Sequence, residues 1–109
     1  MTSITLSSHV LDQDAGGPVA DMQLVLRRAA GETAATQITD ADGRCKFGEL
    51  ELAEGEVLSL TFATGAWYAS RGTTCFYPEV EVRFQPQAPG HYHVPLLVNR
   101  HGYSTYRGS

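Results

Sequence analysis

The stretch Val80-Glu81-Val82-Arg83-Phe84 alternates apolar and charged side chains without a break. Successive side chains of a β-strand point to opposite faces of the sheet. The apolar side chains of this stretch would therefore face a core, and Glu81 and Arg83 would face solvent. The segment predicts a half-buried β-strand, and it sets the pattern for reading the rest of the chain.

The same alternation recurs along the whole chain, with turns between the segments. Asp14-Ala15-Gly16-Gly17-Pro18 and Asp40-Ala41-Asp42-Gly43 are rich in turn-forming residues, and Gly43 is free to take a positive φ. Only residues 66–70 are expected to be helical, with Gly65 before them and Gly72 after them. The expected strands cover residues 4–10, 22–27, 34–39, 44–47, 58–63, 80–85, 91–98 and 103–107.

About eight short strands with one short helix predict an all-β sandwich or barrel. The segments lie too close together for βαβ crossovers, which need a dozen or more residues. A length of 109 residues indicates one domain, covering 1–109. Pro95 interrupts the pattern because it cannot donate a ladder hydrogen bond. It is expected at a bulge, at an edge, or where its nitrogen faces away from a partner strand.

Composition excludes several classes of function. The 8 basic and 12 acidic residues give a net charge of −4, and no basic patch is present to bind nucleic acid. No apolar run is long enough to span a membrane. The first residues lack the features of a signal peptide, so we expect a cytoplasmic protein. Cys45 and Cys75 are expected to be reduced thiols. The four acidic residues Glu49, Glu51, Glu54 and Glu56 are expected on a solvated surface.

Three histidines are expected on the outer faces of strands. His9 lies on the face opposite Ile4, Leu6 and Val10, and the same parity puts His91 and His93 opposite their apolar neighbours. The ordinary interpretation of such a histidine is a solvated surface residue. A weaker alternative is a zinc site formed by His9, His91 and His93, because residues i and i+2 share a strand face. General acid–base use is the stronger functional hypothesis.

An arginine and the C-terminus complete the candidates. Arg44 follows a turn at the start of a strand, where it could form a surface salt bridge or grip a planar or anionic group. The chain ends on Tyr103-Ser104-Thr105-Tyr106-Arg107-Gly108-Ser109, and two tyrosines with an arginine are unusual for a frayed terminus. We expect this segment to pack and to have a function, rather than to be an edge strand with a short tail.

Four segments together resemble the transthyretin-related proteins that act as 5-hydroxyisourate hydrolases. The last of them ends in Tyr106-Arg107-Gly108-Ser109, the feature that separates these hydrolases from the hormone carrier transthyretin. The chain departs from the family at Asn99-Arg100-His101, where a proline followed by an aromatic residue is more usual. The matching segments run in the family's order: 6–12 with Gly17, Pro18 and Ala20; 39–45; 76–80; and 91–97 leading into 103–109.

The resemblance implies a sandwich of two four-stranded sheets, with a short helix after the fifth strand. It implies a homotetramer whose active sites lie at subunit interfaces. The implied reaction opens the ring of 5-hydroxyisourate, an unstable product of urate oxidation, by attack of water. The product would be 2-oxo-4-hydroxy-4-carboxy-5-ureidoimidazoline, on the route to allantoin. No metal or organic cofactor is implied. The implied catalytic residues are His9, Arg44 and His93, and the implied substrate-binding residues are Tyr106, Arg107, Ser109 and His91.

A binding module is the alternative to an enzyme. As in the hormone carrier, a tetrameric channel would then hold a small hydrophobic or aromatic ligand. The two outward histidines, Arg44 and the tyrosine-rich terminus argue against such an apolar channel.

Overall fold

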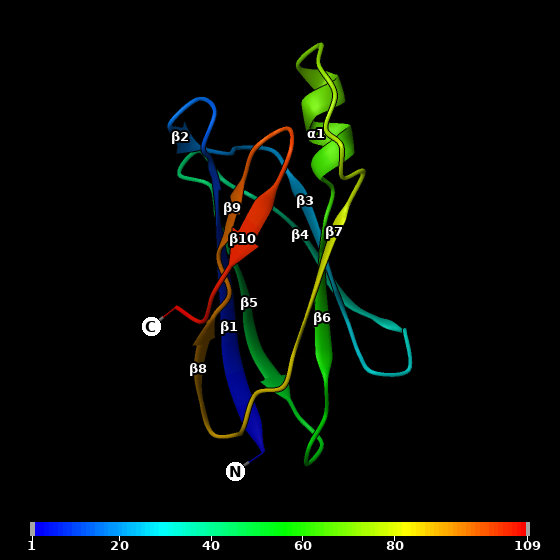
Figure 1. The fold of residues 1–109 in the computed structure, drawn as a ribbon. Helices are drawn as coiled ribbons and strands as arrows, with labels where there is room; N and C mark the ends of the chain where they lie inside the picture. Colours follow the sequence, from blue (N-terminus) through cyan, green and yellow to red (C-terminus); the bar gives the residue numbers. More distant parts are fainter. Residues whose placement is uncertain (1, 109) are drawn as a thin grey trace.

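Two β-sheets pack face to face, and one short helix lies at one end of them (Figure 1). The computed structural model describes residues 2–108. The predicted all-β sandwich is confirmed, but one sheet has six strands and the other four, and the helix follows the sixth strand, where the resemblance implied two four-stranded sheets and a helix after the fifth strand. Its elements are β1 (Ser3–Asp12), β2 (Gly17–Pro18), β3 (Gln23–Arg27), β4 (Thr33–Ile38), β5 (Arg44–Glu51), β6 (Leu58–Phe62), α1 (Thr64–Ser70), β7 (Val80–Phe84), β8 (Gly90–His93), β9 (Leu96–Val98) and β10 (Tyr103–Thr105).

The first sheet is built around β1. β5 pairs antiparallel with one side of β1, while β8 and then β9 pair parallel with the other side, and β10 pairs antiparallel with β9. The single strand expected over residues 91–98 is divided into β8 and β9, and Pro95 lies in the gap between them, where no ladder hydrogen bond is required of its nitrogen. The buried Ser8 hydroxyl donates to the Val94 carbonyl over 2.7 Å and thereby ties β1 to this break.

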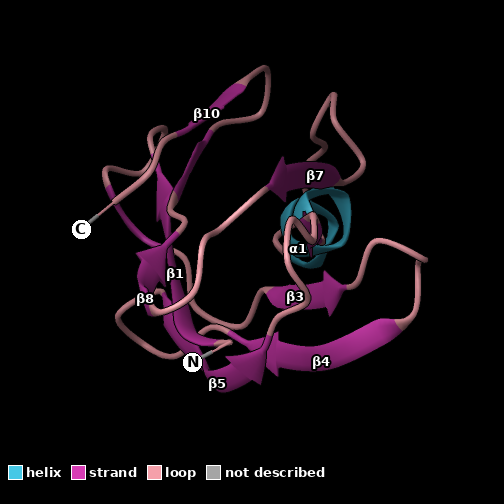
Figure 2. Cartoon of the chain, turned by 90° about the horizontal axis from the view of Figure 1, so that it is seen from below, coloured by secondary structure: helices cyan, strands magenta, loops and turns pink. Residues whose placement is uncertain are grey.

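The second sheet has the order β4-β3-β6-β7. On β7, Val80 is buried while Glu81 and Arg83 are exposed, as the alternation predicts. Between the sheets lies a core whose largest fully buried side chains include Phe62, Ile4, Leu6, Leu24 and Leu60. Seen from one end of the sandwich, β10 and β7 form the sheet edges on the side opposite β4 and β5 (Figure 2).

Several boundaries differ from the sequence expectation. β5 runs on to Glu51 because a bulge at Gly48, with φ of 70°, lets the strand continue past a register shift against β1. Pro18, expected in a turn, pairs with Leu11 at the end of β1. The helix begins at Thr64, two residues earlier than expected. Within residues 2–108, no helix has the length and apolar character needed to cross a membrane.

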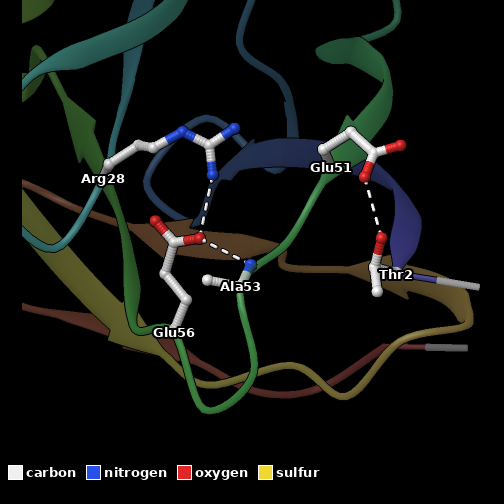
Figure 3. Close-up of polar contacts among 5 residues, drawn as sticks. All are labelled: Thr2, Arg28, Glu51, Ala53 and Glu56. Atoms are coloured by element: carbon white, nitrogen blue, oxygen red, sulfur yellow. Dashed lines mark hydrogen bonds and ion pairs between the residues drawn. The ribbon is translucent and has the colours of Figure 1, made fainter.

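Two carboxylates, Glu51 and Glu56, form polar contacts near the end of β5 and the loop that follows it (Figure 3). The Thr2 hydroxyl donates to Glu51 over 2.8 Å. Glu56 Oε1 lies 2.9 Å from Arg28 Nη1, and the Ala53 amide donates to the same oxygen over 3.1 Å. The Ala53 amide and then the Arg28 charge lower the pKa of Glu56. The expectation of a solvated acidic surface is therefore wrong for Glu56, which is half-buried and ion-paired, whereas Glu51 is exposed as expected.

Candidate active site

Strand β1 separates a core face from a polar face. Ile4 and Leu6 are 1% exposed and Val10 is fully buried, so the even positions point into the sandwich. The odd positions point the other way, since Thr5 is exposed and Ser7 and His9 are half-buried. The predicted side-chain parity of β1 is confirmed. Its outer face can therefore carry a polar site without disturbing the core.

The neighbouring strands extend this polar face in two directions. In the antiparallel register with β5, His9 lies opposite Arg44 and Ser7 lies opposite Lys46. In the parallel register with β8, Thr5 lies beside His91 and Ser7 lies beside His93. Residues directly opposite each other on neighbouring strands lie on the same face of the sheet. The three outward histidines and Arg44 consequently share one face of one sheet.

The turn between β4 and β5 orients His9 and places Arg44. His9 Nε2 lies 2.9 Å from the Asp42 carbonyl oxygen. A carbonyl only accepts, so Nε2 carries the proton and Nδ1 is the open nitrogen of a neutral His9 ring. The Asp40 carboxylate accepts from the amides of Arg44 and Asp42 over 3.0 and 2.9 Å, and these bonds, Arg44 first, lower its pKa. By accepting these two backbone hydrogen bonds, the ionised Asp40 carboxylate fixes the turn that leads into β5.

Gly43 closes the same turn against β1. It has the predicted positive φ, 77°, and its carbonyl accepts from the Val10 amide over 2.8 Å. A Cβ at this position would lie 2.5 Å from the Val10 oxygen and 3.0 Å from the Val19 nitrogen. Only glycine can adopt this positive φ without strain and also leave room for the backbone of Val10 and Val19. The backbone contact therefore fixes the distance between the turn and β1.

His93 is held as a neutral imidazole. Its Nδ1 lies 2.8 Å from the Ser7 hydroxyl oxygen. Burial lowers the pKa of His93 first, and positive charge on His9, Arg44 and His91 lowers it further. The ring is therefore uncharged at neutral pH and can accept a proton.

His91 is the more exposed neighbour of His93. Its Nδ1 lies 2.7 Å from the Thr5 hydroxyl, and its Nε2 lies 3.4 Å from the Ser7 hydroxyl. The face is hollowed here by a cavity of 180 Å³. Its lining comes from β1, β5 and β8 and consists of Ser7, Ser8, Arg44, Cys45, Lys46, His91 and His93.

The C-terminal segment reaches the site through its backbone. The Gly108 amide donates to the His93 carbonyl over 2.8 Å. Tyr106 is 57% exposed, and the Arg107 guanidinium lies 4.8 Å from the centre of the Tyr92 ring. Both residues line a separate 350 Å³ cavity that also includes Tyr92. One chain thus brings together His9, Arg44, His91 and His93, but it does not bring Tyr106 and Arg107 to them. Ser109 lies outside the described residues.

A protein-family model described as the HIUase/Transthyretin family matches residues 6–108. The chain belongs to this family. A relative from Mesorhizobium japonicum named 5-hydroxyisourate hydrolase is 42% identical over 95% of this chain and 91% of its own length. The solved structure of Klebsiella pneumoniae 5-hydroxyisourate hydrolase superimposes with a TM-score of 0.88 at 38% identity, covering 96% of this chain and 98% of that one. Transthyretin from Sparus aurata matches with a TM-score of 0.78 at 29% identity, covering 94% and 95%.

The loop where the chain departs from the family pattern is held by its own polar contacts. The Asn99 side-chain oxygen accepts from the His101 amide over 2.8 Å, and the Asn99 amide donates to the Gly102 carbonyl over 3.0 Å. The Arg100 amide donates to Asp14 over 3.0 Å. These contacts shape the loop between β9 and β10.

The structure does not gather metal ligands at the histidine face. Among residues 2–108, no group of three His, Cys, Asp or Glu side chains is placed to hold a metal ion, so the zinc alternative for His9, His91 and His93 lacks the required geometry. Both cysteines are free thiols, as predicted. Burial raises the pKa of Cys45 to about 11, so this thiol at the cavity stays protonated at neutral pH.

Sequence reasoning did not single out four polar groups of the candidate site. Thr5, Ser7 and Lys46 share the outer face with the histidines, and the Asp42 carbonyl orients His9. Parity from His9 alone indicates Thr5 and Ser7, because they stand four and two residues before it on the same strand. Lys46 and the Asp42 carbonyl become visible only when the β1–β5 register is known.

Proposed function

We propose that this chain hydrolyses 5-hydroxyisourate, opening its six-membered ring between the carbonyl carbon and the ring nitrogen. The observation that carries the proposal is the polar face on which the pair His9–Arg44 lies next to the pair Ser7–His93. The product is 2-oxo-4-hydroxy-4-carboxy-5-ureidoimidazoline. Relatives bearing the name of this hydrolase align over nearly the whole chain, which supports the same assignment.

His93 acts as the general base in the proposed reaction. As a neutral ring, it accepts a proton from water while the water oxygen attacks the substrate carbonyl carbon. The resulting tetrahedral species breaks its carbon–nitrogen bond, and His93 returns the proton to the departing nitrogen. One proton is taken and one is given back, so His93 ends neutral. His9, with Nε2 held by Asp42, orients the water through its open Nδ1.

Arg44 stabilises the negative charge that develops on the carbonyl oxygen. A guanidinium keeps its charge at all working pH values and donates in a fixed plane. Within residues 2–108 its side chain forms no ion pair, so its donors are available to a substrate. Removing a donor of this kind usually costs about 10²–10³ in kcat.

We propose that four chains assemble and that assembly completes the site. The sheet-edge strands β7 and β10 flank a cavity of 350 Å³, and Phe76 and Tyr103 are exposed at 76% and 43%. In such an assembly, Tyr106, Arg107 and Ser109 of one subunit would bind the substrate held by another. Sedimentation analysis tests the subunit number, and a monomer with full activity would contradict this part of the proposal.

The proposed reaction uses no metal and no organic cofactor, and we propose that it runs in the cytoplasm. In the scheme His93 transfers the proton, Arg44 stabilises the developing negative charge and His9 orients the water. Activity that persists after exhaustive chelation is the expected result, and activity restored by added zinc would contradict it.

The test is the decay of 5-hydroxyisourate generated freshly by urate oxidase and followed by absorbance. We expect His93→Asn to lower kcat/KM by about 10²–10⁴ and Arg44→Ala by about 10²–10³, with folding intact. The matched controls are His101→Asn and Arg83→Ala, which change exposed residues away from this face. Wild-type rates from either site variant would remove that residue from the mechanism. Tight thyroxine-like binding without hydrolysis would favour a carrier.

A further inference from the structure

We propose that Ser7 and His91 are positioning residues that serve His93, with the Ser7 hydroxyl joining the two imidazole rings. His91 would then act as the proton partner of His93 and not as a substrate ligand. This inference rests on the proposed function only for its kinetic consequence. The hydrogen-bonded chain itself is a property of the free protein and is tested separately.

The geometry places one hydroxyl between two rings. Ser7 Oγ lies 2.8 Å from His93 Nδ1 and 3.4 Å from His91 Nε2, while His91 Nδ1 lies 2.7 Å from Thr5 Oγ1. The four groups alternate as hydroxyl, imidazole, hydroxyl and imidazole. The parallel register of β1 and β8 creates this order, since it pairs Thr5 with His91 and Ser7 with His93.

The chain must be directional because a serine hydroxyl has one proton to donate. We assign the direction in which His93 Nδ1–H donates to Ser7, Ser7 O–H donates to His91 Nε2, and His91 Nδ1–H donates to Thr5. In this direction the Nε2 of His93 is a bare acceptor, as a general base requires. In the opposite direction, His93 Nε2 would carry the proton and could not accept one from water.

The same contacts give His93 a second proton route during turnover. Once His93 Nε2 has taken a proton from water, the ring can release its Nδ1 proton to Ser7 as Ser7 passes its own proton to His91 Nε2. The number of protons is unchanged, the positive charge moves to the exposed His91, and His93 is left neutral with Nε2–H. When Nε2 gives that proton to the departing nitrogen, Ser7 returns a proton to His93 Nδ1 as His91 Nε2 returns its own to Ser7, so both rings end neutral.

Other groups on this face also influence the two rings. His93 faces His9 on β1 together with Arg44 and Lys46 on β5, and all three carry or can carry positive charge. Thr5 pairs with His91 on β8 and, on its other side, with Glu49 on β5, so Glu49 is the charged residue of β5 that is level with His91. A net positive field around His93 favours passing the charge outward to His91, where solvent screens it.

The first test measures imidazole ¹⁵N chemical shifts in the full-length protein at a pH where His93 is neutral. We expect the Nδ1–H form of His93 in the wild type and in Ser7→Thr, which retains the hydroxyl. In Ser7→Ala we expect a change to the Nε2–H form. Thr36→Ala, on the exposed face of β4, is the control for removing a strand hydroxyl. The same His93 tautomer in all four proteins would overturn the inference.

The second test separates a proton partner from a substrate ligand. We expect Ser7→Ala and His91→Gln to lower kcat by about 10–100-fold, the usual effect of losing a group that orients a histidine, with KM nearly unchanged. In the pH profile of kcat, the midpoint of the acidic limb should also shift in both variants. A rise in KM alone for His91→Gln would instead make His91 a substrate ligand. If the wild type is inactive, the proposed function fails while the tautomer test still decides the hydrogen-bonded chain.

Discussion

Replacing Gly43 with alanine tests how closely the β4–β5 turn is fitted to β1. Gly43 has φ of 77°, and the added Cβ would lie 2.5 Å from the Val10 oxygen. Ordinary contact begins at 3.4 Å, so the turn must move by about 0.9 Å, the difference between these two distances. Both sides of the contact are backbone, which leaves no flexible side chain to absorb the movement.

Gly72→Ala is the matched control, because Gly72 has φ of 76° and nothing within 4 Å of its Cβ position. Both variants carry the cost of a left-handed alanine, about 1–2 kcal/mol. Gly43→Ala also disrupts the bond from the buried Val10 amide to the Gly43 carbonyl, which adds about 1–3 kcal/mol. The turn carries the Asp42 carbonyl and Arg44, and a misplacement of about 1 Å can cost about 100-fold in rate.

The assay combines urea unfolding at one protein concentration with 5-hydroxyisourate decay under conditions where each variant stays folded. We expect Gly72→Ala to lose stability but keep its kcat/KM. We expect Gly43→Ala to lose more stability and about 100-fold in kcat/KM. Equal stability and equal activity of the two variants would refute the claim that backbone contact sets the site.

Three further predictions follow from the same structure. Because its surroundings lower the pKa of His93 below the ordinary 6.5, kcat/KM should fall on acidification with a midpoint below that value, and a midpoint at or above it would contradict the role of His93 as base. Deleting residues 106–109 should cost far more activity than stability, measured by the decay assay and by thermal unfolding; a fully active deletion variant would remove the terminus from the site. Phe62→Ala should destabilise the protein by about 3–5 kcal/mol, measured by urea unfolding, yet leave kcat per folded molecule nearly unchanged, since Phe62 is fully buried away from the polar face.

Local alternation was enough to predict an all-β fold and the outward faces of His9, His91 and His93, while the choice of a sandwich over a barrel came from the family resemblance. Side-chain parity on β1 depends only on a period of two, so His9 is placed outward as soon as Ile4, Leu6 and Val10 are placed inward. An irregular position for Pro95 was predictable because a proline cannot donate in a ladder, but the division of the expected strand 91–98 into β8 and β9 was not. The helix and the strand on either side of it follow from turn residues and periodicity.

Pairing between distant strands was not predictable from local pattern. The register that places Arg44 opposite His9 depends on the Gly43 contact and on the bulge at Gly48, and neither leaves a periodic mark in the sequence. The Glu56–Arg28 ion pair joins residues that are 28 positions apart, so a local reading assigned Glu56 to solvent. The direction in which Arg107 points depends on its contact with Tyr92 and not on the motif that contains it.

The two faces of β1 have a consequence for how this protein can be changed. The apolar positions Ile4, Leu6 and Val10 contribute to the core, while Thr5, Ser7 and His9 lie on the outer face. Substitutions at Thr5, Ser7 and His9 can therefore be sampled in a combinatorial library while Ile4, Leu6 and Val10 stay constant. Such a library should yield mostly folded variants, most of them with the proposed hydrolysis weakened, which makes β1 a starting point for installing new chemistry on this scaffold.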